Sequence, residues 1–290
     1  MHDLYQQVTD RIVAALQAGT PPWVRPWNSA TDPVPMNAET RRLYRGVNFL
    51  TLAIEAHTRG YPRNCWLTYR QATALGAQVR KGEHGTPVVF WKLRTVNTKA
   101  EAEDARVIPL LRCYTVFNTA QIDGLPRTMA QPLPSVPAWQ SDDVAEMLIA
   151  TSGADIRHGG SKAFYTSDRD YIQLPPRATF TQAAGYYAKT LHELVHWTGH
   201  RSRLDRQLGR RFGGEAYAAE ELIAELGSAF LCAHCRIEGR LQHASYVSNW
   251  LRVLRSDKRA IFVAGTRAQH AADYLLTRST ETASAEALAA

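Results

Sequence analysis

The chain has 290 residues, of which 45% are hydrophobic and 21% are charged, and its formal net charge is +7. This composition is typical of a soluble globular protein, and the length allows two domains that each bury a core. No apolar run is long enough to cross a membrane, and the polar N-terminal segment does not resemble a secretory signal. We therefore expect a cytoplasmic protein with no membrane partner.

Positive charge is concentrated in the first half of the chain. Residues 1–137 hold 16 Lys and Arg against 10 Asp and Glu, whereas residues 138–290 hold 18 against 17. A basic first half beside a nearly neutral second half indicates a polyanionic partner for the first, with nucleic acid as the leading candidate.

The N-terminal segment is predicted to be a helix followed by an extended segment without regular secondary structure. Residues 4–17 place apolar side chains at helical spacing, and Gly19 ends the helix. Residues 20–27, TPPWVRPW, must be extended because three prolines exclude helix. Their aromatic and basic side chains form a candidate edge for stacking on bases and binding phosphates, or else the tryptophans simply anchor the segment to the core. These side chains are Trp23, Arg25 and Trp27.

Short helices and a small sheet are predicted for the rest of the first half. The predicted helices cover residues 46–57 and 66–75, a glycine-punctuated turn covers residues 76–85, and the strands cover residues 86–92 and 107–118.

Arginine and lysine alternate with aromatic residues through this half. Cations that follow the phosphates, together with flat rings that stack on bases, are what single-stranded nucleic acid binding requires, although ordinary basic domains share the pattern. The candidate DNA-binding residues are Trp23, Arg25, Trp27, Arg45, Trp66, Arg70, Arg80, Lys81, Trp91 and Lys92.

A proline-rich stretch, QPLPSVPAW at residues 131–139, marks the boundary between two domains. We place a basic single-stranded DNA-binding domain at residues 1–128, a linker at residues 129–139 and a second domain at residues 140–290. The second domain is predicted to begin with a helix at residues 142–151 and two short strands within residues 163–175. The strand that ends before the next helix would offer an edge to which a peptide substrate pairs.

The most specific motif is LHELVHWTGH at residues 191–200. Residues four apart share a helix face, so His192 and His196 direct two imidazoles at one point, and Glu193 lies beside it. In this HExxH arrangement two neutral imidazoles bind zinc, and the glutamate takes a proton from the water that the zinc activates. A plausible N-cap at Thr179 or Thr181 and a stop at Gly199 support a helix here. The motif predicts a zinc hydrolase, against the alternative of a buried helix with two satisfied histidines.

A catalytic zinc takes three protein ligands, so a third must come from elsewhere. The metzincin pattern would need a histidine at position 202, which is Ser202, and His200 is displaced from that pattern. An acidic residue on a following helix, as in the glutamate zincins, is the better option. The candidates are Glu215, Glu220, Glu221 and Glu225.

The acidic candidates lie in or just before a predicted helix at residues 218–231. Glu221 and Glu225 are four apart and share a face, which suits one carboxylate on the metal and one holding the far nitrogen of a ligand histidine. We assign Glu221 to the metal and Glu225 to the histidine; the reverse order remains open, and Glu220 is a weaker third choice. Tyr217 and His243 are candidates for steadying an oxyanion.

The four cysteines are too scattered for a disulfide framework. Cys232 and Cys235 form a single CxxC within an apolar helical stretch, with no second pair to complete a structural zinc site, so we expect buried thiols. A further helix around Trp250 is expected to pack the domain, and residues 279–290 are expected to fray.

An ordered set of motifs in both halves resembles the ArdC antirestriction proteins of conjugative plasmids, which are related to the N-terminal part of some plasmid primases. In the first half the motifs are WLTYRQA at residues 66–72, VRKGEHG at 79–85, VVFWK at 88–92 and YTVFNTAQIDGLP at 114–126. In the second half they are DYIQLP at residues 170–175, HELVHWTGH at 192–200 and YAAEELIAEL at 217–226.

The resemblance implies an α+β protein of two domains: a small mixed α/β domain that binds single-stranded DNA, and a zincin-like metalloprotease domain. It implies a metal site at His192, His196 and an acidic ligand, taken as Glu221, with Glu193 as the base. It also implies protection of incoming plasmid DNA from restriction enzymes. Zn²⁺ is the expected cofactor, with Mn²⁺ as the alternative.

Three functions stay open at this level. The leading one is an antirestriction protein that binds single-stranded DNA during conjugation and carries a metallopeptidase centre for an unidentified protein or peptide substrate. The second is a DNA-coating protein whose metal is structural or vestigial. The third is an ordinary peptidase without a DNA partner. Double-stranded DNA is a further candidate partner for the first two.

Overall fold

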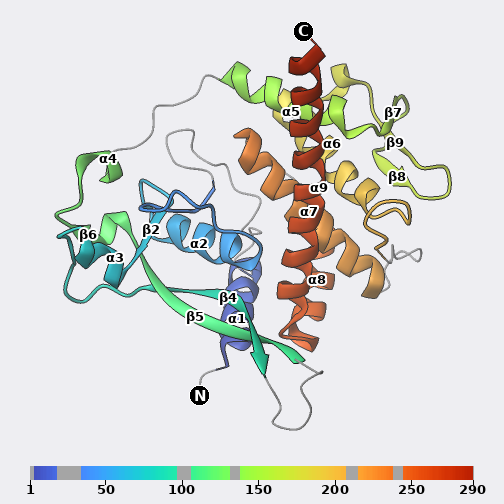
Figure 1. Ribbon diagram of the computed structural model, residues 1–290. Helices are drawn as coiled ribbons and strands as arrows, with labels where there is room; N and C mark the ends of the chain where they lie inside the picture. The colour runs from blue at the N-terminus through green and yellow to red at the C-terminus, as the bar shows by residue number, and fades with distance from the viewer. Residues whose placement is uncertain are drawn as a thin grey trace.

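The computed structural model describes residues 3–17, 34–96, 106–130, 138–206, 215–237 and 244–289. Within these ranges, helices and mainly antiparallel sheets build two regions, which confirms the expected α+β class. Figure 1 shows the long helix α9 (Ala260–Ala289) near the middle of the molecule, with residues 47–74 on one side of it and residues 155–174 on the other. No helix of the described residues is both long and apolar enough to span a membrane.

The N-terminal region is a four-stranded sheet with helices packed around it. Its strands lie in the order β1 (Met36–Asn37), β2 (Cys65–Thr68), β5 (Arg106–Asn118) and β4 (Thr86–Val96). The helices are α1 (Leu4–Gln17), α2 (Val47–Thr58), α3 (Tyr69–Ala74) and α4 (Arg127–Ala130). A second, two-stranded sheet pairs β3 (Gln78–Val79) with β6 (Ile122–Asp123), which follows the 3₁₀ turn Thr119–Gln121.

The predicted helix over residues 66–75 is wrong in its first three positions, which belong to β2. Trp66 and Leu67 are fully buried in a strand that pairs with β1 and β5, so burial between strands decides their conformation. The helix begins only at Tyr69, because the side chain of Thr68 accepts from the Gln71 amide and Gln71 bonds back to Thr68.

Helix α2 is fixed to the edge of this sheet by one side chain. Asn48 donates from Nδ2 to the Val89 carbonyl at 2.7 Å, and its Oδ1 accepts from the Val89 amide at 2.8 Å. The buried backbone N–H and C=O of Val89 on edge strand β4 are thereby satisfied. Leu52 and Ala56 of the same helix pack over Val88 in a buried cluster.

The C-terminal region consists of helices around a three-stranded sheet. After α5 (Ala138–Ser152), strands β7 (Asp155–His158), β8 (Phe164–Thr166) and β9 (Tyr171–Leu174) pair in the order β7-β9-β8. The 3₁₀ turn Arg177–Thr179 leads into α6 (Ala183–Thr198), which is followed by α7 (Glu215–Cys235), α8 (Ala244–Ser256) and α9.

Three predictions for this region are wrong. Strand β9, which precedes α6, is central in its sheet, so the free edges belong to β7 and β8. The N-cap of α6 is Gln182, since Thr179 belongs to the preceding 3₁₀ turn and Thr181 comes before the cap. The C-terminal tail continues as helix α9 to Ala289. By contrast, Cys232 and Cys235 are buried free thiols, as expected.

The two regions share one apolar core. Phe49 of α2 meets Phe230 of α7 edge to face, with ring centroids 4.8 Å apart, and Val8 of α1 lies in the same buried cluster. Helix α9 comes so close to α2 that a Cβ on Gly265 would lie 3.2 Å from the Val47 nitrogen. Residues 131–137 of the predicted linker lie outside the described residues, so the boundaries near residues 128 and 140 stay predictions.

Candidate metal centre

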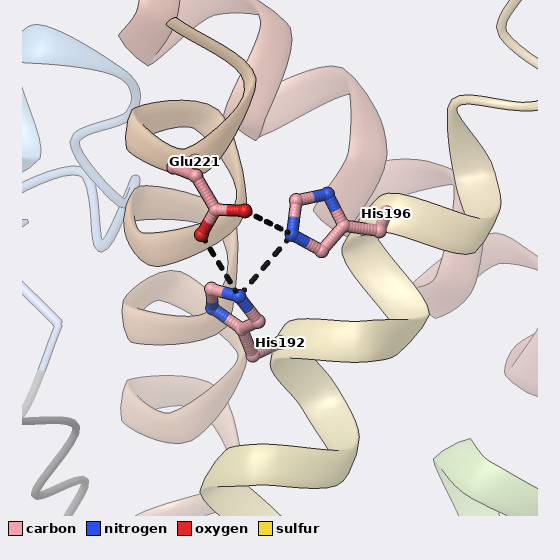
Figure 2. Close-up of side chains that lie close together, drawn as sticks. All are labelled: His192, His196 and Glu221. Carbon is pink, nitrogen blue, oxygen red and sulfur yellow. Dashed lines mark hydrogen bonds and ion pairs between the residues drawn. The ribbon is translucent and has the colours of Figure 1, made fainter. Parts of the chain in front are cut away.

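Helices α6 and α7 pack side by side and supply all the side chains of the candidate centre. His192 and His196 project from one face of α6, and Glu221 projects from α7 towards both of them (Figure 2). Within the described residues, these three form the one group whose ligand atoms all lie within 4.8 Å of one another. His192 and Glu221 are buried, at 2% and 7% exposure, and His196 is nearly so.

The separations between the three donors suit a single cation. The Nε2 atoms of His192 and His196 are 3.2 Å apart. The Glu221 carboxylate lies 3.6 Å from the first and 3.5 Å from the second. A tetrahedral zinc with bonds of ~2.0–2.1 Å would separate its ligand atoms by roughly 3.3–3.4 Å. The three side chains therefore lie where three ligands of one ion would lie.

The other nitrogen of each imidazole faces a second carboxylate. Nδ1 of His196 is 3.2 Å from Oε1 of Glu220, and Nδ1 of His192 is 3.8 Å from Oε1 of Glu225. A proton on Nδ1, directed at a carboxylate, leaves the Nε2 lone pair available for a metal. Two such lone pairs at 3.2 Å repel each other, and either a metal cation between them or a proton on one Nε2 removes the repulsion.

Arg206 holds the carboxylate that faces His196. Its Nε and Nη2 lie 3.1 and 2.8 Å from the two oxygens of Glu220, and it also donates to the Val195 carbonyl and the Thr198 hydroxyl. Burial favours a higher pKa for Glu220, but the hydrogen bonds from His196 and Arg206 outweigh it and lower that pKa. Glu220 is therefore ionised, and its carboxylate is held by His196 of α6 and by Arg206 of the segment that follows α6.

Glu193, the predicted base, is paired with a lysine on its own helix. It is 3% exposed, and one carboxylate oxygen lies 2.9 Å from Nζ of Lys189. Burial favours a higher pKa for Glu193, but the charges of Lys189 and the two histidines outweigh it and lower the pKa. Burial also raises the pKa of Glu225, to about 8.

Known proteins match the chain in both halves. The N-terminal domain of anti-restriction factor ArdC matches residues 2–117, and the zincin-like metallopeptidase family matches residues 143–267. The metal-free crystal structure of the antirestriction ArdC protein from the R388 plasmid is 44% identical in sequence, with a TM-score of 0.83 over 97% of this chain and 99% of that one. The chain belongs to the ArdC antirestriction family.

Other relatives agree with this assignment. The Mn(II)-bound structure of the same plasmid protein gives a TM-score of 0.80 at 46% identity, over 96% of this chain and 98% of that one. An uncharacterized protein of Sinorhizobium fredii, y4eC, is 44% identical over 94% of this chain and 91% of its own length. The DNA primase TraC of Escherichia coli is 41% identical over 94% of this chain, but the chain spans only 27% of that primase.

A glycine lets the two helices of this ArdC-family centre approach each other. A Cβ on Gly227 of α7 would lie 2.8 and 2.9 Å from the two methyl groups of Val195 on α6. The neighbouring Ser228 donates to the Ala188 carbonyl of α6 at 3.0 Å. Glycine in a helix interior costs about 1 kcal/mol relative to alanine, so close packing is the physical reason for it here.

The remaining predicted site residues lie apart from this group. His200, which follows α6, has its Nδ1 2.7 Å from the hydroxyl of Ser202 and is not among the three clustered donors. The side chain of Glu215 and all of His243 lie outside the described residues. Tyr217 is partly exposed near the start of α7.

Sequence reasoning missed Lys189 and Arg206, although the spacing of Lys189 four residues before Glu193 was a usable signal.

The predicted DNA-binding residues differ in exposure and in the ion pairs that they form. Trp66 is wrong as a stacking residue, because its side chain is 0% exposed and its Nε1 donates to Asn64 at 2.8 Å. Arg45 is engaged by Asp273 of α9. Arg80 is paired with Glu83 at 2.7 Å, and Arg70 and Lys81 are exposed. The other five, outside the described residues or on β4 with side chains that are not described, are Trp23, Arg25, Trp27, Trp91 and Lys92.

Proposed function

We propose that His192, His196 and Glu221 bind a divalent cation, zinc or manganese, in a metallopeptidase centre. We further propose that the first domain binds single-stranded DNA, and that the protein thereby protects plasmid DNA from restriction during conjugation. The observation that carries the proposal is the convergence of two imidazole nitrogens and one carboxylate at separations of 3.2–3.6 Å. When bound, such a cation polarises a scissile carbonyl and activates water.

The donor set supports either metal. Imidazole and carboxylate ligands suit zinc, and they also accommodate manganese. The plasmid ArdC protein, 46% identical to this chain, has an Mn(II)-bound structure, which supports a divalent cation as the cofactor of this chain. Glu220 and Glu225 would orient the two imidazoles from the Nδ1 side and leave each Nε2 towards the metal, which is the usual role of carboxyl groups behind metal-binding imidazoles.

The proposed hydrolysis gives Glu193 two roles. It accepts a proton from the attacking water and later passes that proton to the leaving amine. Its burial excludes bulk water from the carboxylate. Lys189 at 2.9 Å holds the carboxylate in one position and must share it with the incoming water before the proton moves.

The rival function is a DNA-coating protein in which the metal is structural. The pairing of Glu193 with Lys189 favours it, because a carboxylate already bound by an ammonium is a weaker base. In that case the protein protects DNA by occupancy alone, and Glu193 has no chemical role.

Replacing Glu193 by glutamine separates the two functions. The enzyme hypothesis predicts that Glu193→Gln loses protection of transferred plasmid DNA while oligonucleotide affinity stays at the wild-type value; the coat hypothesis predicts full protection. Glu281→Gln, at an exposed position of α9, is the matched control and should behave as wild type. The salt dependence of oligonucleotide binding tests the DNA partner, since a peptidase without one would show no steep loss of affinity with salt.

A further inference from the structure

The long strands β4 and β5 present an exposed face beyond the end of α2. Directly paired residues of antiparallel strands share a face, and the register pairs Val88 with Tyr114 and Phe90 with Arg112. Val88 is covered by α2 and is 1% exposed, whereas Phe90 and Tyr114 are 46% and 43% exposed and Arg112 is also exposed. In Figure 1 the two strands run on past α2.

The two exposed rings form an ordered row with a third, buried ring. The centroids of Phe90 and Tyr114 are 5.6 Å apart at an interplanar angle of 70°. Tyr44, which is 8% exposed, lies behind Phe90 with centroids 6.5 Å apart. Large exposed aromatic groups of this kind mark interaction sites, because leaving them in water forgoes the free energy of burying them.

The charge around this row suits a polyanion. Strands β4 and β5 together contain no Asp or Glu, and they contain four basic residues: Lys92, Arg94, Arg106 and Arg112. The acidic residues of the connecting segment come after the last pair of the ladder, Val96 and Arg106. That pair lies six positions from Phe90, a distance of roughly 20 Å along the strand.

We propose that Phe90, Tyr114 and Arg112 form the single-stranded DNA-binding face of this protein. The two rings stack on unpaired bases, and the guanidinium binds a phosphate between them. The rings are inclined at 70°, so bases stacked on them must splay apart, which a duplex does not allow. A second copy of the chain is a poor occupant because its own basic strands would be repelled. The inference rests on the DNA-binding part of the proposed function.

The test measures the affinity of the full-length protein for a single-stranded oligonucleotide at fixed salt. Each of Phe90→Ala and Tyr114→Ala should weaken binding by about 5- to 150-fold, since one stacked base contributes ~1–3 kcal/mol. Phe90→Trp should retain binding. Phe164→Ala is the matched control: Phe164 is 39% exposed and forms a similar edge-to-face pair with Tyr171, 6.3 Å away, in the other domain. It should leave the affinity unchanged.

Arg112→Gln tests the phosphate contact separately. The slope of log affinity against log salt should become shallower by about 0.7, the value for one phosphate contact on a single strand. An unchanged slope would remove Arg112 from the proposed face.

Each remaining outcome points to one conclusion. If the wild-type protein does not bind the oligonucleotide, the DNA-binding part of the proposed function fails. If the wild type binds but Phe90→Ala and Tyr114→Ala bind equally well, the function stands and this face is wrong. An equal loss on duplex of the same sequence would overturn base stacking. A changed oligomeric state in the variants would mean that the face is a self-contact. Thermal unfolding at the wild-type temperature verifies that each variant folds.

Discussion

The ammonium of Lys189 lies 2.9 Å from a carboxylate oxygen of Glu193, one helical turn further along α6. A positive charge at this position opposes a divalent cation held by the adjacent histidines. We predict that Lys189→Met binds Mn²⁺ or Zn²⁺ roughly tenfold more tightly than wild type, because charges a few ångströms apart interact by one to several kcal/mol. Calorimetric titration of the metal-free protein with Mn²⁺ or Zn²⁺ measures the dissociation constant of each variant. Lys189→Arg keeps the charge and should match wild type; unchanged affinity in Lys189→Met would refute the electrostatic role.

Glu220 and Glu221 are neighbours in sequence but face different atoms, which allows their roles to be separated. Glu220 faces Nδ1 of His196 at 3.2 Å, whereas Glu221 faces the two Nε2 atoms. We predict that Glu220→Ala weakens metal binding by about 10- to 100-fold yet still reaches the wild-type amount of metal at saturation. Equilibrium dialysis at increasing metal concentration shows both quantities. Wild-type affinity in Glu220→Ala would mean that this carboxylate does not support the site.

Gly227 allows α7 to approach Val195 of α6, and alanine has no room there. We predict that Gly227→Ala lowers the free energy of unfolding by about 1–3 kcal/mol, despite the better helix propensity of alanine. Gly185→Ala in α6 is the matched control, because the nearest heavy atom, on Phe180, is 4.0 Å away. That change should be neutral or stabilising by up to about 1 kcal/mol. Urea unfolding measures both, and equal stability of the two variants would argue against a tight helix contact.

Asp170 ties the β8–β9 turn to the segment after α6 through Arg203, whose guanidinium also lies 3.8 Å from the Trp197 ring centroid. The hydrogen bond from Arg203 lowers the pKa of Asp170, although burial opposes it. Because the folded pKa lies below the unfolded value of about 3.9, the pair stabilises the protein above that pH and the stabilisation is lost as the pH falls through the folded pKa.

Two variants check this pH dependence. Below about pH 4 the free energy of unfolding should fall more steeply for wild type than for Asp170→Asn. Arg203→Met should cost about 1–3 kcal/mol at neutral pH, since charged hydrogen bonds are lost. Parallel curves for wild type and Asp170→Asn between pH 2 and 6 would show that the pair is not linked to folding.

The sequence predicted those elements whose own pattern decides their structure. Residues 4–17 form α1 as expected, since the apolar period acts locally, whereas the predicted stop at Gly19 lies outside the described residues. The hairpin at Phe164–Leu174 also follows from local strand and turn signals. Residues 66–68 were mistaken for helix because only pairing with β1 and β5, distant in sequence, makes them a strand.

In the candidate site, too, local sequence patterns predicted some features, whereas others depend on tertiary packing. Helical spacing alone places His192 and His196 on one face, and the structure brings Glu221 to them and Glu225 to the other side of His192. The choice between Glu220 and Glu221 depends on the rotation of α7 against α6, which no local pattern encodes. The contact of Arg206 with Glu220 likewise depends on how the chain returns after α6. Trp66 was misassigned because composition does not reveal which aromatic residues are buried.

The central claim is that His192, His196 and Glu221 are the ligands of one divalent cation. Metal content per chain, measured by elemental analysis after dialysis against a limiting metal buffer, tests it most directly. We predict about one metal ion in wild type and in Glu193→Gln, and none in His192→Ala, His196→Ala or Glu221→Ala, with oligonucleotide binding unchanged throughout. Metal retained in Glu221→Ala, or absent from the wild-type protein, would contradict the account.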